Sequence, residues 1–132
     1  MSDEPAQQLI VLIPVKTVSI TNRREHWVVR AHRTRHHRRI AAMVVGTAIK
    51  KRGTPITFPL VIDMVRLASR RMDDDNLRAA LKALRDGIAD ALGVNDGDKR
   101  LTWNYFQSSY IASSTMGVMV SIYNSKGEIC NE

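Results

Sequence analysis

Residues 55–93, PITFPLVIDMVRLASRRMDDDNLRAALKALRDGIADALG, contain the two clearest periodic patterns of the chain. Apolar side chains alternate at positions 56, 58, 60, 62 and 64, which predicts a strand within residues 55–68. Further on, apolar residues recur at helical spacing, at positions 77, 80, 81, 84, 88 and 91. We expect a helix that starts near Asp74 and closes at Gly93.

Similar patterns extend this unit in both directions. Residues 8–20 are rich in Leu, Ile and Val and predict a strand, with an edge or bulge at Pro14. Residues 22–32 predict a loop or ribbon. From Thr34 to Arg52 we expect a helix stopped by Gly53, with one face formed by Ile40, Met43, Val44, Thr47 and Ala48.

Two further strands are expected at residues 99–112 and 116–124, joined as a hairpin through Ala112–Gly117. The order of elements is then β-α-β-α-β-β. This order predicts an α/β (α+β) fold, in which helices pack against a mixed sheet. A length of 132 residues favours one domain that spans residues 1–132.

Positive charge is concentrated in the first half of the chain. Lys and Arg number 20 against 13 Asp and Glu, for a net charge of +7. Residues 1–72 carry 14 basic and 4 acidic side chains, whereas residues 73–132 carry 6 and 9. This asymmetry predicts a surface that binds a polyanion, nucleic acid above all, and a separate acidic cluster.

The single cysteine, Cys130, excludes an intramolecular disulfide and fits a reducing cytoplasm. The apolar run Leu9–Val15 is too short to cross a bilayer, and it follows acidic residues where a signal peptide has basic ones. We therefore expect a cytoplasmic protein that does not associate with membranes.

Three consecutive aspartates, Asp73, Asp74 and Asp75, come where the predicted strand gives way to the predicted helix. In extended backbone alternate side chains share a face, so Asp73 and Asp75 are expected to point together. Crowded carboxylates suit Mg²⁺ or Mn²⁺. Helix capping and solvation explain the same residues equally well. Asp96 and Asp98 follow the helix and bring further carboxylates back toward the sheet, and both interpretations stay open.

Residues 70–100 resemble the signature of the RusA family of Holliday junction resolvases. That family has a basic strand end, then Asp-x-Asp-Asn-Leu, an amphipathic helix and a further Asp. The matching residues here are Arg70, Arg71, Asp73, Asp75, Asn76, Leu77 and Asp96. The chain length and the order of elements also resemble the family.

The resemblance implies that Asp73, Asp75 and Asp96 form a catalytic triad that binds Mg²⁺, with Mn²⁺ as the alternative ion. The family frequently has Asp-Asp where this chain has Asn95-Asp96, which puts the third ligand in doubt. Asp98 is the alternative to Asp96.

A second departure concerns a lysine that the family often has three residues after the Asn of the motif. That position is Ala79 here. Lys82 lies three residues further on the same helix face and could replace it. Its ammonium would offset charge at the scissile phosphate, and a solvated surface lysine is the equal alternative.

Residues 22–39 hold seven arginines, all four histidines and a single acid, Glu25. Because Arg binds phosphate bidentately, this run suits a DNA backbone. The expected DNA-binding residues are Arg23, Arg24, Arg30, Arg33 and Arg35 of the run, Arg70 and Arg71, and Asn76 and Arg78 of the second helix, to which the resemblance adds Asn22.

The aromatic residues of the basic run have a structural explanation that we favour. Trp27 is expected to be partly buried, with stacking on an exposed base as the alternative. His32, His36 and His37 are expected on a solvated helix face, because their spacing lacks matching metal ligands.

The function implied by the resemblance is a phage or prophage endonuclease of DNA recombination and repair. It would nick opposed strands of a four-way junction and leave 5′-phosphate and 3′-hydroxyl ends. Paired cuts need two active sites, so we expect a homodimer, with the apolar faces of residues 8–20 and 55–68 as candidate dimer surfaces. Two alternatives are a non-catalytic DNA-binding protein and a metal-dependent nuclease for flaps or other branched DNA.

Overall fold

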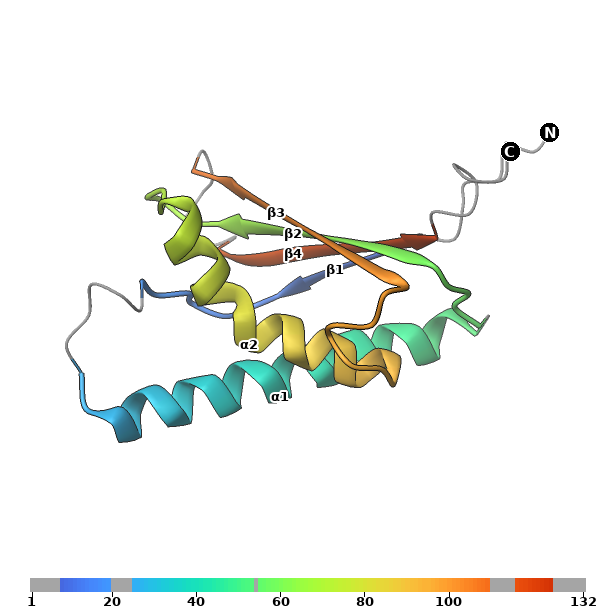
Figure 1. Ribbon diagram of the computed structural model, residues 1–132, viewed down its shortest axis with the longest axis horizontal. Helices are drawn as coiled ribbons and strands as arrows, with labels where there is room; N and C mark the ends of the chain where they lie inside the picture. Colours follow the sequence, from blue (N-terminus) through green and yellow to red (C-terminus); the bar gives the residue numbers. More distant parts are fainter. Residues whose placement is uncertain (1–7, 20–24, 54, 110–115, 125–132) are drawn as a thin grey trace.

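The computed structural model describes residues 8–19, 25–53, 55–109 and 116–124. Six elements follow one another in the expected β-α-β-α-β-β order (Figure 1). They are β1 (Gln8–Ile13), α1 (Trp27–Arg52), β2 (Leu60–Leu67), α2 (Asp74–Leu92), β3 (Leu101–Ser108) and β4 (Gly117–Asn124).

The four strands form one mixed sheet in the order β1-β4-β2-β3. β2 and β3, which α2 connects, are parallel, as the sequence predicts for a helix-linked pair. The predicted hairpin of the last two strands is wrong. β4 pairs antiparallel with β1 on one side and β2 on the other, so β2 separates it from β3. The last two strands are therefore not neighbours in the sheet.

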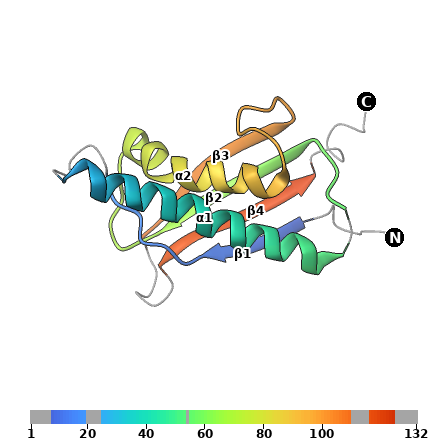
Figure 2. The same cartoon turned by 90° about the horizontal axis from the view of Figure 1, so that it is seen from below.

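Both helices lie on the same face of the sheet (Figures 1 and 2). The core forms between that face and the helices, and its fully buried side chains include Ile62 and Met64 of β2 and Leu81, Leu84 and Ile88 of α2. The mixed α/β architecture predicted from the sequence is confirmed.

Helix α2 has the predicted bounds and the predicted apolar stripe. Leu77, Ala80, Leu81, Leu84 and Ile88 are all buried. Gly93 ends the helix in the left-handed conformation (φ 77°), and its N–H donates to the carbonyls of the last turn.

Helix α1 begins at Trp27, seven residues before the predicted start, so the prediction of a loop at residues 27–32 is wrong. His26 caps it, because its Nδ1 accepts a hydrogen bond from Val28 N at 3.1 Å. The first two turns carry no apolar stripe, which is why periodicity misses them. Trp27 is 72% exposed, which contradicts the prediction that it is partly buried.

The buried face of α1 also differs from the predicted one. It consists of His37, Ala41 and Val45, spaced four residues apart, whereas Met43 is 60% exposed. Because α2 crosses closely at this level, small residues face it and larger apolar ones flank the contact. The prediction that His37 is solvated is wrong, and burial lowers the pKa of its imidazole.

The strands are shorter than the apolar runs that predict them. β1 ends at Ile13, directly before Pro14, which has no N–H to donate to a ladder. β2 begins at Leu60, and residues Ile56 and Phe58 pack against the core from outside the strand. Among the described residues, neither helix is long and apolar enough to cross a membrane.

One face of the sheet is turned away from both helices, and no described element covers it. We call it the open face. Leu12, Met119, Val65 and Phe106 are aligned by register across all four strands and form an apolar row on it. Leu12 is 39% exposed and Phe106 is 49% exposed.

Candidate functional site

The acidic cluster lies at the N-terminal end of α2, where residues 69–73 lead from β2 into the helix. Asp73 is the N-cap: its backbone is extended (φ −73°, ψ 168°), and its carboxylate accepts a hydrogen bond from Asn76 N at 2.9 Å. The capping interpretation therefore holds for Asp73. Asp74 and Asp75 occupy the first turn, and all three aspartates are exposed.

The predicted reason for Asp73 and Asp75 to point together is wrong. It assumed extended backbone through residue 75, but the helix already begins at Asp74. Asp75 makes no hydrogen bond or ion pair with any described residue. Its carboxylate is therefore free to bind a ligand from solvent.

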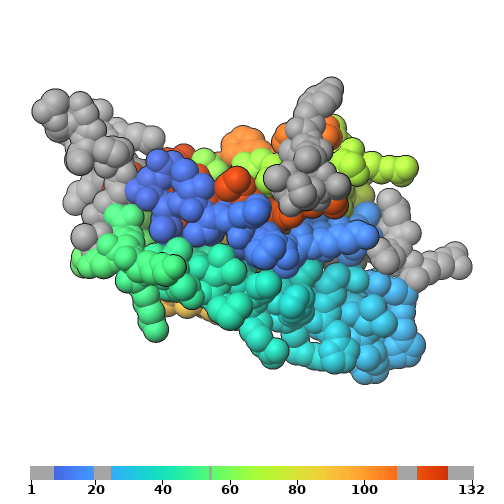
Figure 3. Space-filling model, turned by 180° about the vertical axis from the view of Figure 1, so that it is seen from behind, coloured from blue at the N-terminus to red at the C-terminus, as the bar shows by residue number. Residues whose placement is uncertain are grey.

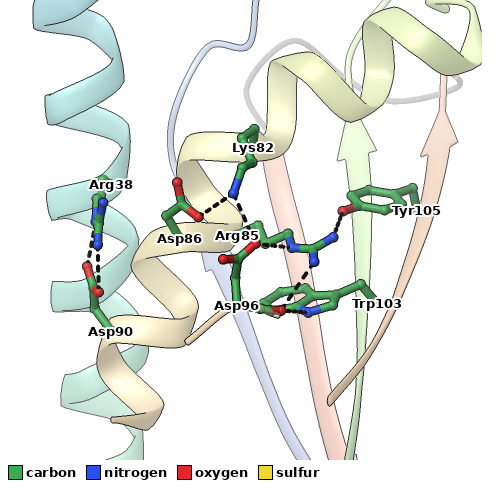
Figure 4. A network of polar contacts seen from close by, with 8 residues as sticks. All are labelled: Arg38, Lys82, Arg85, Asp86, Asp90, Asp96, Trp103 and Tyr105. Carbon is green, nitrogen blue, oxygen red and sulfur yellow. Dashed lines mark hydrogen bonds and ion pairs between the residues drawn. The ribbon is translucent and has the colours of Figure 1, made fainter. Parts of the chain in front are cut away.

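Asp96 lies beside the middle of α2, in the loop that leads to β3. Its Oδ2 accepts hydrogen bonds from Lys82 Nζ at 3.0 Å and from Arg85 Nε at 2.9 Å (Figure 4). Trp103 Nε1 donates to the backbone carbonyl of Asp96 at 2.9 Å, and Arg85 Nη2 donates to the same carbonyl at 3.2 Å. Arg85 also donates to the Tyr105 hydroxyl at 2.7 Å, and its guanidinium stacks on the ring of Trp103. These contacts together fix the loop of Asp96.

The same contacts shift the pKa values of Asp96 and Lys82. The Lys82 ammonium, with a further contribution from Arg85, lowers the pKa of Asp96. Hydrogen bonds to Asp86 and Asp96 raise the pKa of Lys82. Asp96 is therefore ionised and Lys82 is protonated at neutral pH.

The described residues contain no group of three Asp, Glu, His or Cys side chains close enough to hold one metal ion. Asp73 and Asp75 lie two residues apart in the chain and are exposed, whereas Asp96 is held by its two basic partners. Their oxygen donors suit Mg²⁺ chemically. A third ligand from Asp96 would require its carboxylate to leave Lys82 and Arg85 and to move toward Asp73 and Asp75, because Asp96 lies beside the middle of α2 and not at its first turn.

The alternative third ligand, Asp98, has its own partner. Arg100 donates to it through the backbone N–H and through two side-chain nitrogens, all within 3.0 Å. These bonds lower the pKa of Asp98 to about 2. Asp98 caps the turn before β3, which gives it a local structural role.

Lys82 is 56% exposed and lies between the carboxylates of Asp86 and Asp96. It is not a fully solvated lysine. Its Nζ donates to Asp86, four residues further along the same helix, at 2.7 Å. The neighbouring Asp90 instead pairs with Arg38 of α1 and joins the two helices (Figure 4).

The predicted basic residues near the cluster differ in what they contact. Arg70 and Arg71 are exposed and form no ion pair with described residues. The guanidinium of Arg78 stacks on Tyr105, 4.8 Å from the ring centroid. Asn76 is only 8% exposed, so its side chain supports the helix start from the inside.

On α1, Arg33 makes a bidentate pair with Glu25, and Arg30 lies 3.8 Å from the same carboxylate. The pair with Glu25 raises the pKa of Arg33 and uses part of its hydrogen-bonding capacity. Arg35 is exposed and contacts His32. Asn22, Arg23 and Arg24 lie outside the described residues.

Trp103 and Tyr105 of β3 are the functional-site residues that the sequence does not single out. Both fix Arg85, which in turn holds Asp96. The available signal is their alternation with Leu101, which places all three on the helix-covered face of β3. There they meet Arg78 and Arg85 of α2.

No family model matches this chain, and no curated protein matches it either, so the assignment of a function depends on the residues described above.

Proposed function

We propose that this chain is a Mg²⁺-dependent endodeoxyribonuclease of the RusA type, which resolves four-way DNA junctions by paired nicks. The observation that supports this proposal most is that the basic and acidic side chains around the first turn of α2 form no ion pairs with each other. Arg70 and Arg71 lie within five residues of Asp73 and Asp75, yet the two sets form no ion pair. Acidic and basic groups that are close in sequence and form no ion pair with each other suit a divalent cation and a phosphate.

Asp73, Asp75 and Asp96 would hold the ion, with Mn²⁺ able to replace Mg²⁺. When bound, the ion supplies a water of lowered pKa and offsets negative charge at the phosphate. The chain itself holds the ligands in place. The cap bond to Asn76 N fixes Asp73, and Arg85 fixes the loop of Asp96 through its bond to the backbone carbonyl.

Lys82 has a double role in this proposal. Its ammonium keeps Asp96 ionised, and on transfer of that carboxylate to the ion it becomes available to the phosphate. Lys82→Met should therefore lower the cleavage rate, while Lys82→Arg should retain most of it. Equal rates for both variants and the native protein would remove Lys82 from the site.

A homodimer would supply the two active sites that paired cuts require. The apolar row of Leu12, Met119, Val65 and Phe106 on the open face supports this assembly, because exposed apolar rows of this kind mark association surfaces. Such a dimer would act in the cytoplasm of a bacterial host.

The function is tested with labelled junction, flap and duplex DNA, with and without Mg²⁺. The native protein should nick the junction symmetrically and only with Mg²⁺. Asp73→Asn is an informative variant because Asn caps helices as well as Asp, so the fold is preserved. It should cut more than about 100-fold more slowly while it still binds the junction.

A non-catalytic DNA-binding protein is the second candidate. Asp73 is used as a cap and Asp96 is used in ion pairs, so both have structural roles that need no metal. This candidate predicts that no DNA is cut under any condition and that binding is the same with and without Mg²⁺. Preferential cutting of flaps over junctions would instead favour a nuclease for other branched DNA.

A further inference from the structure

Arg66 is a buried cation without an acidic partner. It follows Leu60, Ile62 and Met64 at period two on β2, so it continues the core-facing row of that strand and is only 7% exposed. Its Nε donates to Thr17 Oγ1 at 2.7 Å, and its Nη1 donates to the backbone carbonyl of Arg70 at 2.6 Å. Of the five N–H groups of a guanidinium, three are left without an acceptor among the described residues.

The unused side of Arg66 borders an open hollow of about 560 Å³, which we call the Arg66 pocket. The segment after β1 and the segment after β2 form it, and both lie at the same end of the molecule (Figures 1 and 3). Its lining contains four cations and no acid, and its polar residues are Lys16, Thr17, Ser19, Arg66, Arg70 and Arg71.

The hydroxyl of Ser19 is a second, independent observation that points to a ligand. Its Oγ is buried and forms no hydrogen bond within the described part of the chain. A buried hydroxyl without a partner is rare, because it gives up its hydration without a replacement hydrogen bond. This hydroxyl belongs to the lining of the same pocket.

The electrostatics of the pocket favour an anion. Desolvation disfavours the charged form of Arg66 and lowers its pKa, which shows that no nearby carboxylate compensates for its burial. Lys16, Arg70 and Arg71 add like charges around it, and none of them has an ion-pair partner among the described residues. A phosphate offers several acceptors to a guanidinium fork, and its negative charge would reduce the repulsion among the four cations.

We propose that the Arg66 pocket binds one phosphate group, and that its natural source is a phosphate of the DNA backbone next to the one held at Asp73 and Asp75. Met72, which lines the pocket, directly precedes Asp73, so the pocket and the aspartates are neighbours along the chain. The identity of the macromolecule rests on the proposed function, whereas the affinity for phosphate does not.

The first experiment uses inorganic phosphate and the full chain. Because Arg66→Gln could unfold the protein, the test variant is the exposed pair Lys16→Gln/Arg71→Gln. Lys51→Gln is the control, since it removes an exposed cation at the far end of α1. Phosphate should raise the melting temperature of the native and control proteins by about 2–4 °C over chloride at equal ionic strength. The double variant should lose at least half of that rise.

The second experiment measures junction binding without divalent ions. The double variant should bind about tenfold more weakly than the native protein, and its log–log salt dependence should flatten by about 1 for each phosphate that is no longer neutralised. The control should change affinity by less than about twofold. Weaker DNA binding supports the backbone phosphate as the source, even if free phosphate alone stabilises little.

Other outcomes separate the two proposals. Phosphate-specific stabilisation with unchanged DNA binding would overturn the DNA source and leave a free-phosphate site. If phosphate acts like chloride and the double variant binds DNA as the control does, the pocket proposal falls while the nuclease can still be active. Stabilisation by phosphate in a protein that cuts no DNA would keep the pocket and reject the nuclease.

Discussion

Arg85 of α2 holds Asp96 at two points: its Nε donates to the carboxylate at 2.9 Å, and its Nη2 donates to the backbone carbonyl at 3.2 Å. The two residues are eleven positions apart, and one guanidinium fork ties the loop after α2 back onto the helix. The third aspartate of the proposed triad is therefore kept ionised and in place by groups that a metal ion would have to displace in part.

This arrangement predicts a pH dependence of stability. Because Lys82 and Arg85 lower the pKa of Asp96, the ion pairs stabilise the native state above the ordinary carboxyl pKa, and the stabilisation is lost as the pH falls through the lower native value. Asp96→Asn should be less stable than the native protein at pH 7, by less than about 1 kcal/mol for each partially exposed pair.

The difference should be smaller at an acid pH below the ordinary carboxyl pKa than at pH 7. Urea unfolding at both pH values measures it, and Asp98 titrates equally in both proteins and cancels. A difference that is the same at neutral and acid pH would contradict the assigned ion pairs.

At Gly87, the addition of a single methyl group should lower the stability of the protein. A Cβ there would lie 2.2 Å from the carbonyl oxygen of Arg38 and 2.8 Å from Ala41 Cβ, so the helices would have to move apart. Gly87→Ala should destabilise the protein by about 1–3 kcal/mol despite the better helix propensity of Ala.

Gly46→Ala is the matched control, because the nearest atom to its Cβ is Ala91 Cβ at 4.0 Å. It should stabilise the protein by up to about 1 kcal/mol. Thermal unfolding compares the two variants. Similar effects of both would show that the close crossing of α1 and α2 is not as described.

The open face predicts how the chain assembles. Phe106→Asp should weaken the homodimer, because it places a charge in the apolar row, while the fold stays intact since the side chain is 49% exposed. Met43→Asp is the control, as Met43 is equally apolar, 60% exposed and lies on α1. Sedimentation of both variants measures the effect. A native protein that is monomeric at all concentrations would exclude this dimer.

The basic surface predicts a steep dependence of DNA binding on salt. If about six phosphates are contacted, the affinity for a junction should fall about 10³-fold between about 50 and 200 mM salt. Binding titrations at several salt concentrations measure the slope. A flat response would remove the arginines from the interface.

The sequence predicts those elements of the fold whose apolar residues follow one clear periodic pattern. The stripe from Leu77 to Ile88 and the cap residues around it define α2, and the alternation from Leu60 to Met64 defines β2. The position of β4 could not be predicted, because strand order depends on non-local pairing that leaves no local pattern. The first turns of α1 escape prediction because their apolar residues, Trp27, Val28 and Val29, are consecutive and exposed and so form no stripe at helical spacing.

For the candidate site, too, some residues could be predicted from the sequence and some contacts could not. The acidic residues at the start of α2 could be identified from their types and order, but the partners of Asp96 could not, since they depend on where the loop after α2 folds back. Arg66 has a visible signal in the sequence: a cation at a core-facing position of an otherwise apolar row. A charge at such a position predicts either a buried partner or a ligand.

Two neighbouring carboxylates distinguish a metal ligand of a nuclease from an ordinary surface acid. Asp74 and Asp75 lie in the same first turn, both exposed, and their replacement by Asn removes the same charge. The measurement is the single-turnover rate of junction nicking in Mg²⁺ by the two variants. We expect Asp75→Asn to lose more than about 100-fold in rate, whereas Asp74→Asn should stay within about threefold of the native rate. Equal rates for the two variants, or no nicking by the native protein, would contradict this expectation.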